Sequence, residues 1–263
     1  MTHTESSAAD DVYNKVPAVT LAFWVIKILA TTVGETAADV LSTTFNLGLV
    51  VTSYVMGALL IIALVAQFRT KRYVPGVYWI TVVFISVVGT LISDNLVDNL
   101  GVTLVTTTTI FSLALAAVFV WWYASEKTLS VHTIYTNRRE AFYWGAILFT
   151  FSLGTSGGDL LSERLALGYG VALAIFAAGI AVVYLLYKMH AINGVLAFWI
   201  AYILTRPLGA SAGDLITQAP ADGGFGIGRL SSTGVILVII VALVAYLTVQ
   251  ERKHPTKAVA VDS

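Results

Sequence analysis

The stretch WGAILFTFSLGTSGGD, residues 144–159, places an aspartate fifteen residues after a tryptophan inside a mostly apolar run. Gly154 lies between the two, so the stretch follows the pattern W-x9-G-x4-D. A carboxylate within such a run is costly in a membrane unless it is paired, protonated, hydrated or bound to a cation. The function of the chain therefore depends on what surrounds Asp159.

The same spacing occurs four times in the chain. Its copies are Trp24–Gly34–Asp39, Trp79–Gly89–Asp94, Trp144–Gly154–Asp159 and Trp199–Gly209–Asp214. Successive tryptophans are 55, 65 and 55 residues apart, and the ten extra residues fall in the central loop SEKTLSVHTIYTNRRE. This spacing predicts two similar halves, each containing two repeats.

The composition indicates an integral membrane protein. Of the 263 residues, 57% are hydrophobic and only 11% are charged, which is more apolar surface than a soluble domain of this size can bury. Eight apolar segments have the length that a helix needs to cross a bilayer, and long continuous runs argue against a β-barrel. The segments lie near 17–40, 46–67, 76–97, 103–124, 141–162, 167–188, 193–216 and 232–250.

The predicted fold is therefore an all-α integral membrane protein of eight transmembrane helices, arranged as four parallel helical-hairpin repeats in pseudo-symmetric halves. The even-numbered segments carry no charge in their apolar runs, so we expect them to face lipid around four central odd-numbered helices. The predicted divisions are a disordered tail (1–16), a first half (17–124), a cytoplasmic linker (125–140), a second half (141–250) and a second tail (251–263).

Basic residues indicate the orientation of the chain. Eleven Lys and Arg residues fall on the side of the two termini, and only Arg164 and Arg229 fall in the opposite loops. By the positive-inside rule, both termini lie in the cytoplasm. With the tryptophans at the cytoplasmic interface, the aspartates come about 22 Å further along each helix, in the outer part of the membrane.

A ladder of polar residues in steps of four runs along each odd-numbered segment, as in Lys27, Thr31, Glu35 and Asp39. Such a ladder forms one polar stripe, which we expect to face the interior. The glycines are expected to allow close helix packing, and the tryptophans to serve as interfacial anchors or packing residues. Pro207, beside Arg206, is expected to kink its helix and provide a hinge.

The chain resembles a family of bacterial membrane proteins built from four tandem two-helix repeats, each with a signature tryptophan, whose function is unknown. The resemblance covers about residues 17–250 and depends on Trp24, Trp79, Trp144 and Trp199 with the glycine and aspartate that follow each. It implies the repeat architecture and a location in the bacterial inner membrane, and it implies no substrate or reaction.

The charges expected on the inward stripes suggest a cation site. Five acids are the predicted substrate and metal ligands: Glu35, Asp39, Asp94, Asp159 and Asp214. Lys27 and Arg206 are predicted to tune their charge, which leaves an excess of three acids. The surrounding hydroxyl groups favour a hard ion, and no histidine or cysteine lies on a stripe to ligate a softer metal.

We therefore expect a transporter that exchanges a small hard cation (Mn²⁺, Mg²⁺, Ca²⁺ or Na⁺) for protons. The alternative is a sensor or assembly module whose buried acids only join helices, since each aspartate could simply cap a helix end. Enzyme activity is not expected, because Ser156 stands where an intramembrane aspartyl protease needs the first glycine of G-x-G-D. The expected partners are the lipid bilayer and a cation or proton, with no cofactor and no nucleic acid; homo-oligomerisation is left open.

Overall fold

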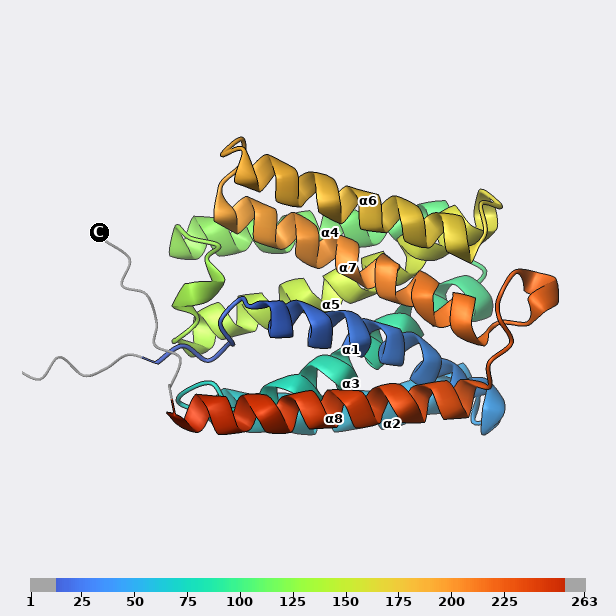
Figure 1. Ribbon diagram of the computed structural model, residues 1–263, viewed down its shortest axis with the longest axis horizontal. Helices are drawn as coiled ribbons and strands as arrows, with labels where there is room; N and C mark the ends of the chain where they lie inside the picture. The colour runs from blue at the N-terminus through green and yellow to red at the C-terminus, as the bar shows by residue number, and fades with distance from the viewer. Residues whose placement is uncertain (1–12, 254–263) are drawn as a thin grey trace, which may run out of the picture.

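The computed structural model describes residues 13–253, which form eight long α-helices (Figure 1). The helices are α1 (Leu21–Asp39), α2 (Gly48–Arg69), α3 (Pro75–Asp94), α4 (Leu104–Glu126), α5 (Asn137–Asp159), α6 (Tyr169–Lys188), α7 (Gly194–Thr217) and α8 (Arg229–Lys253). Short polar side chains begin several of them: those of Thr20, Thr103, Thr136 and Asn193 each accept a hydrogen bond from a backbone N–H in the first turn. The predicted all-helical fold is confirmed for these residues.

Seven of the eight helices are long and apolar enough to cross a membrane. The exception is α5, because glycine, serine and threonine interrupt its apolar run between Thr150 and Asp159. Most of the residues in that part of α5 are buried inside the protein, so its polarity is directed at other helices.

The four odd-numbered helices lie between the even-numbered ones (Figure 1), and their contacts form a closed ring. α1 packs against α3, α3 against α5, α5 against α7, and α7 against α1. The membrane-crossing windows of α1, α3 and α7 are 56–67% buried, whereas those of the even-numbered helices are 17–22% buried. The expectation that odd helices lie inside is therefore correct, and α1 faces α5 across the ring as α3 faces α7.

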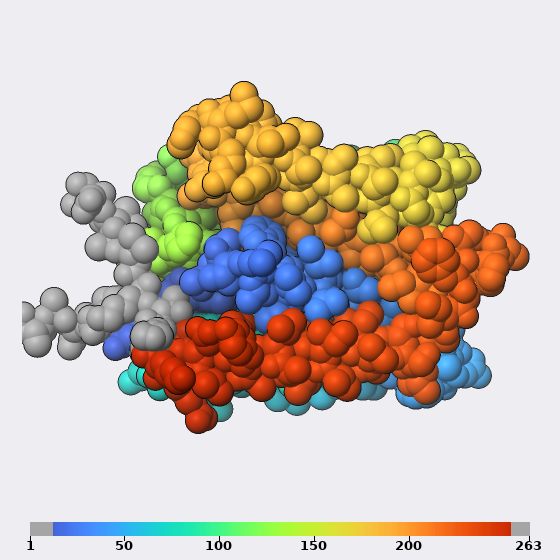
Figure 2. Space-filling model, viewed as in Figure 1, coloured from blue at the N-terminus to red at the C-terminus, as the bar shows by residue number. Residues whose placement is uncertain are grey.

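The predicted hairpins require each even-numbered helix to pack along the helix that precedes it. The structure shows a different arrangement. α2 packs on α3, α4 on α5, α6 on α7, and α8 returns to pack on α1. Each even helix touches the end of its own predecessor only near the connecting turn. The even helix of every repeat thus covers the odd helix of the next repeat, and α8 lies along α1 to complete the outer layer (Figure 2).

The motif glycines set the distance between neighbouring odd helices. In every repeat, the glycine backbone contacts the residue seven positions after the tryptophan of the next repeat, so closely that a methyl group at the glycine would lie within 1.8–2.6 Å of that side chain. The four contacts are Gly34 with Ser86, Gly89 with Phe151, Gly154 with Arg206, and Gly209 with Thr31. The predicted role of these glycines in close packing is confirmed, and the contacts give the ring an approximate four-fold symmetry.

Aromatic residues close the end of the ring at which the odd helices begin, here called the tryptophan end. The residue before each motif tryptophan is also aromatic, and its ring lies 5.5–6.2 Å from the tryptophan of the next repeat. The pairs are Phe23–Trp79, Tyr78–Trp144, Tyr143–Trp199 and Phe198–Trp24. Trp79, Trp144 and Trp199 are buried, so they act as packing residues and not as a lipid-facing belt.

The segment before α1 is also held at the tryptophan end. Residues 1–12 of the predicted tail lie outside the described residues, as do residues 254–263 at the other end, but Asn14, Lys15 and Val16 are buried. Lys15 Nζ lies 2.7 Å from Glu140 Oε2, and Gln67 Nε2 donates a hydrogen bond of 2.9 Å to Glu140 Oε1. This buried ion pair joins the start of the chain to α2 and α5.

Substitution of Gly89 by alanine tests the close approach of the helices. The new methyl group would lie 2.6 Å from Phe151 Cβ and 3.2 Å from its backbone carbon, so we expect a loss of about 1–3 kcal/mol of stability. Gly57→Ala in α2 is the control, since nothing lies within 4 Å of the added carbon. Thermal unfolding of the purified protein in detergent measures both; equal effects would contradict the packing role of Gly89.

The orientation of the chain can be tested with single cysteines, because the sequence contains none. We expect Ala221→Cys, in the loop between α7 and α8, to react with a membrane-impermeant maleimide on intact cells. Lys71→Cys, between α2 and α3, should react only after the membrane is permeabilised. The opposite pattern would reverse the predicted orientation.

Candidate functional site

The residues at positions 3, 7, 11 and 15 after each motif tryptophan form successive layers along the axis of the ring. We name them, in order from the tryptophan end, the Lys27 layer, the Arg206 layer, the Glu35 layer and the aspartate layer. The layers are Lys27, Val82, Ile147 and Tyr202; then Thr31, Ser86, Phe151 and Arg206; then Glu35, Thr90, Thr155 and Ala210; and finally Asp39, Asp94, Asp159 and Asp214. The first three layers vary among the repeats, and only the aspartate layer has the same residue in all four.

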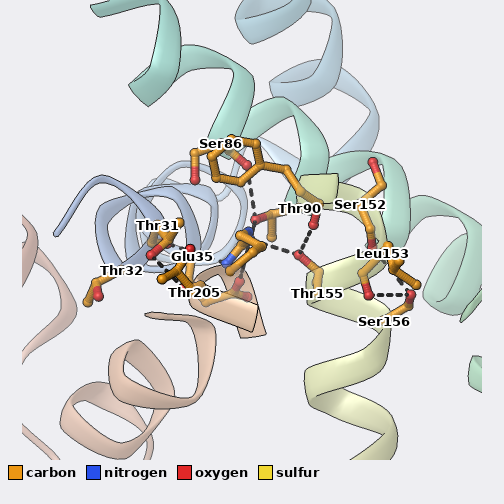
Figure 3. Close-up of polar contacts among 12 residues, drawn as sticks. Thr31, Thr32, Glu35, Ser86, Thr90, Ser152, Leu153, Thr155, Ser156 and Thr205 are labelled. Atoms are coloured by element: carbon orange, nitrogen blue, oxygen red, sulfur yellow. Dashed lines mark hydrogen bonds and ion pairs between the residues drawn. The ribbon is translucent and has the colours of Figure 1, made fainter. Parts of the chain in front are cut away.

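Glu35, Thr90 and Thr155 point toward one another (Figure 3), and Arg206 extends from α7 to contact all three. Its Nη2 atom donates to Glu35 Oε2 at 2.9 Å, to Thr155 Oγ1 at 2.7 Å, and to Thr90 Oγ1. Nη1 donates to the backbone oxygen of Thr31 at 3.4 Å. The guanidinium is fully buried and reaches α1, α3 and α5, so it crosses the centre of the ring.

Lys27 extends from α1 to the adjacent helix α7. Its Nζ donates to the backbone oxygen of Tyr202 at 3.2 Å and to Thr205 Oγ1 at 2.8 Å. The ammonium also lies 3.9 Å from the centre of the Tyr202 ring and 4.9 Å from that of Phe151, which belongs to the facing helix α5. Lys27 is fully buried, and its hydrogen-bond partners are neutral.

Glu35 is the acid that pairs with Arg206. Its carboxylate is buried, and Thr90 Oγ1 also donates to it at 3.4 Å. Removal of one partner of such a pair leaves the other charge buried and uncompensated. In this conformation Glu35 is therefore engaged by the protein itself, and the predicted charge-tuning role of Arg206 is directed mainly at this one acid.

The aspartate layer lies near the opposite end of the ring from the aromatic residues. Asp214 is buried, and Asp39, Asp94 and Asp159 are half-buried. Glu35 is near enough to Asp94, Asp159 and Asp214 to act on each electrostatically. The structure thus gathers the five predicted acids at one end of the bundle.

Only one of the four aspartates has a basic partner among residues 13–253. Asp39 Oδ2 lies 3.3 Å from Arg229 Nε, at the start of α8. The sequence placed Arg229 in a loop and gave no indication of this pair, because α8 is brought beside α1 only by closure of the ring. Asp94, Asp159 and Asp214 form no ion pair within the described part of the chain.

A break in regular helix geometry follows three of the aspartates. Immediately after Asp39, Asp94 and Asp159, the chain forms a single π-helical turn: Val40–Thr44, Asn95–Asn99 and Leu160–Arg164. In the fourth repeat α7 continues without such a turn and contains Pro207 instead. Single π-turns occur frequently at functional sites, and the sequence carried no local signal for them.

Several of the predicted oxygen ligands are engaged within their own helices. The hydroxyl groups of Thr31, Thr32 and Ser156 donate to backbone oxygens three or four residues earlier, and Ser156 lies away from the Arg206 cluster in Figure 3. The hydroxyl groups of Thr90 and Thr155 also donate to backbone oxygens four residues earlier, but their oxygens contact Arg206 Nη2 as well, so they face the centre of the ring. Within residues 13–253, no three carboxylate or imidazole groups are close enough together to form a ready-made metal site.

The sequence matches a family described as a Repeat of Unknown Function (DUF347) at residues 22–73, 77–128, 142–192 and 197–253. The chain belongs to this family. Each DUF347 repeat contains one tryptophan, glycine and aspartate of the motif and one odd and one even helix. Comparison with curated proteins and with solved structures finds no match.

The DUF347 repeats therefore correspond to units of sequence, while packing combines parts of two repeats. The odd helix of each repeat supplies one residue to every layer of the site, and the even helix of the preceding repeat covers it from outside. The site requires all four DUF347 repeats.

A double-mutant cycle tests the Glu35–Arg206 pair. We expect Glu35→Gln alone to cost about 3–5 kcal/mol, because it leaves a buried guanidinium without a counter-charge. Combining it with Arg206→Gln should cost less than the sum of the single variants. Unfolding of the protein in detergent measures the four states, with Arg138→Gln, which breaks an exposed ion pair with Glu126, as a control expected to cost about 0–1 kcal/mol. Additive effects would show that the pair contributes nothing.

Proposed function

We propose that the protein is a membrane transporter that exchanges a small hard cation for protons at the aspartate layer. The observation that carries the proposal is the presence of four equivalent aspartates at one level of a closed helical ring, three of them without a basic partner among the described residues. Mn²⁺, Mg²⁺, Ca²⁺ and Na⁺ are the candidate substrates.

The balance of charge in the site supports cation binding. Glu35 and the four aspartates face three bases, Lys27, Arg206 and Arg229, so two acids stay uncompensated if all groups are ionised. A charge within a membrane costs at least about 2.5–3.5 kcal/mol. Binding of a cation or of protons removes this excess, and alternation between the two is the chemistry of exchange.

The ligand atoms favour a hard cation. Near the aspartate layer the available groups are carboxylate, hydroxyl and backbone oxygens. The described residues include two histidines, His132 and His190, and both are more than twenty residues away in sequence from any motif aspartate. Mg²⁺ and ions like it are commonly held by one or two carboxylates with several retained waters. Such binding does not need three ligands in place before the ion arrives.

The ends of the ring differ in a way that suits entry of an ion from the aspartate end. Phe23, Tyr78 and Tyr143 are almost fully buried and close the tryptophan end, where the Tyr78 and Tyr143 hydroxyls are hydrogen-bonded at 2.5 Å. The side chain of Asp39 is 23% exposed. With the predicted orientation, the acids are reached from the outside of the cell and the route to the cytoplasm is closed.

Transport in proteoliposomes tests the proposal. Purified protein is reconstituted with a pH-sensitive dye inside the vesicles, and each of the four candidate cations is added outside. We expect one of them to drive proton movement, and Asp159→Asn to weaken its apparent affinity at least about tenfold, because a ligand is lost.

Asp222→Asn is the matched control, because it makes the same change at an exposed residue in the loop between α7 and α8. It should leave transport unchanged. Unaltered flux in Asp159→Asn would remove the proposed site, and a lack of flux with every cation would favour the structural module.

A further inference from the structure

We infer that the Arg206 guanidinium occupies a cation site in the middle of the transport route and blocks it. A substrate ion passes only when the guanidinium leaves Glu35, Thr90 and Thr155. The inference rests on the proposed function. It adds a second cation site, in the Glu35 layer, and assigns Arg206 as the group that blocks it.

The position of the guanidinium supports this role. Arg206 originates one layer nearer the tryptophan end and reaches forward to the Glu35 layer, where its Nη2 contacts the side chain from each of the other three repeats. The fourth member of that layer is Ala210, on the same helix as Arg206, which leaves space for the guanidinium on that side. A single side chain thus fills the centre of the ring at this level.

The atoms that bind the guanidinium could also bind an inorganic cation. One carboxylate and two hydroxyl oxygens contact Arg206 Nη2, and oxygen atoms of this kind are the ligands of hard cations. Without Arg206 this layer carries one negative charge and sits between the aspartates and the aromatic closure. The guanidinium and a substrate ion therefore compete for the same oxygens.

The surroundings of Arg206 allow it to move. Pro207 follows directly and lacks the N–H that would bond to the preceding turn of α7, so the helix is weakened at this point. Arg206 Nε is buried without a hydrogen-bond partner among residues 13–253, which shows that the guanidinium is incompletely satisfied where it is.

The same helix links the two cation sites. Asp214 lies eight residues after Arg206 on α7, beyond Pro207. An ion bound by Asp214 can shift the outer part of α7 about this weak point and so change the position of Arg206. Arrival of substrate in the aspartate layer is thereby coupled to release of the block.

Accessibility of a cysteine in the Glu35 layer tests the block without any transport measurement. Ala210→Cys is introduced alone and together with Arg206→Gln plus Glu35→Gln, a pair of changes that removes the guanidinium without leaving a buried unpaired charge. The purified protein in vesicles is treated with a small cationic thiol reagent. We expect the cysteine to react about tenfold faster or more when Arg206 is replaced, because charge-assisted hydrogen bonds hold the block in place.

Ala221→Cys, in the exposed loop between α7 and α8, is the matched control and should react equally in both backgrounds. Size-exclusion profiles identify any variant that fails to fold. If the Arg206→Gln plus Glu35→Gln protein fails, Arg206→Lys with Ala210→Cys is measured in its place. Lysine keeps the charge but has one nitrogen to offer in place of a guanidinium, so an intermediate rate supports the inference. Equal rates at Ala210→Cys in all folded backgrounds would overturn it.

Cation flux in the same vesicles separates the two proposals. If the protein is a transporter, the Arg206→Gln plus Glu35→Gln variant should conduct cations without moving protons. Faster labelling in that variant, with no flux in the unaltered protein, would contradict the proposed function and support the block by Arg206. Coupled flux that is the same in the variant and in the unaltered protein would contradict the block by Arg206 and support the proposed transport function.

Discussion

The close approach of four helices at their glycines is the constraint on which the rest of the structure depends. Because the backbone of each motif glycine touches the next odd helix, the ring is too narrow to hold more than a few side chains at its centre. The even helices are excluded from the interior and take positions outside it. Two long basic side chains, Lys27 and Arg206, then extend into the remaining space and meet neutral oxygens in one case and a carboxylate in the other.

Much of this arrangement could be predicted from the sequence, because the repeat spacing is strict. Four copies of one motif, each with an even number of apolar segments, require parallel repeats, and the polar ladders predicted which helices face inward. The period of a repeat does not specify which neighbour a helix covers, so the sequence could not predict that each even helix packs on the odd helix of the next repeat, and the predicted hairpin arrangement is not confirmed. The Asp39–Arg229 and Lys15–Glu140 pairs were missed for a related reason: each joins residues that meet only when distant parts of the chain close the bundle.

Symmetry and asymmetry have separate roles in the bundle. Tryptophan, glycine and aspartate are the same in all four repeats, and they build the aromatic closure, the helix contacts and the aspartate layer. The charged residues at the other inward positions occur once each: a lysine in the first repeat, a glutamate in the same repeat and an arginine in the fourth. The four-fold framework thus encloses a site that is itself asymmetric, with one ion pair, Glu35–Arg206, at its centre.

The closure of the ring by α7 against α1 has a consequence for biosynthesis. The Glu35 carboxylate enters the membrane with the first helix, but the arginine that pairs with it follows 171 residues later. The carboxyl group of Glu35 therefore lacks its basic partner until α7 has been synthesised. A chain that ends before α7 would lack this partner, which leaves the buried acid of α1 uncompensated.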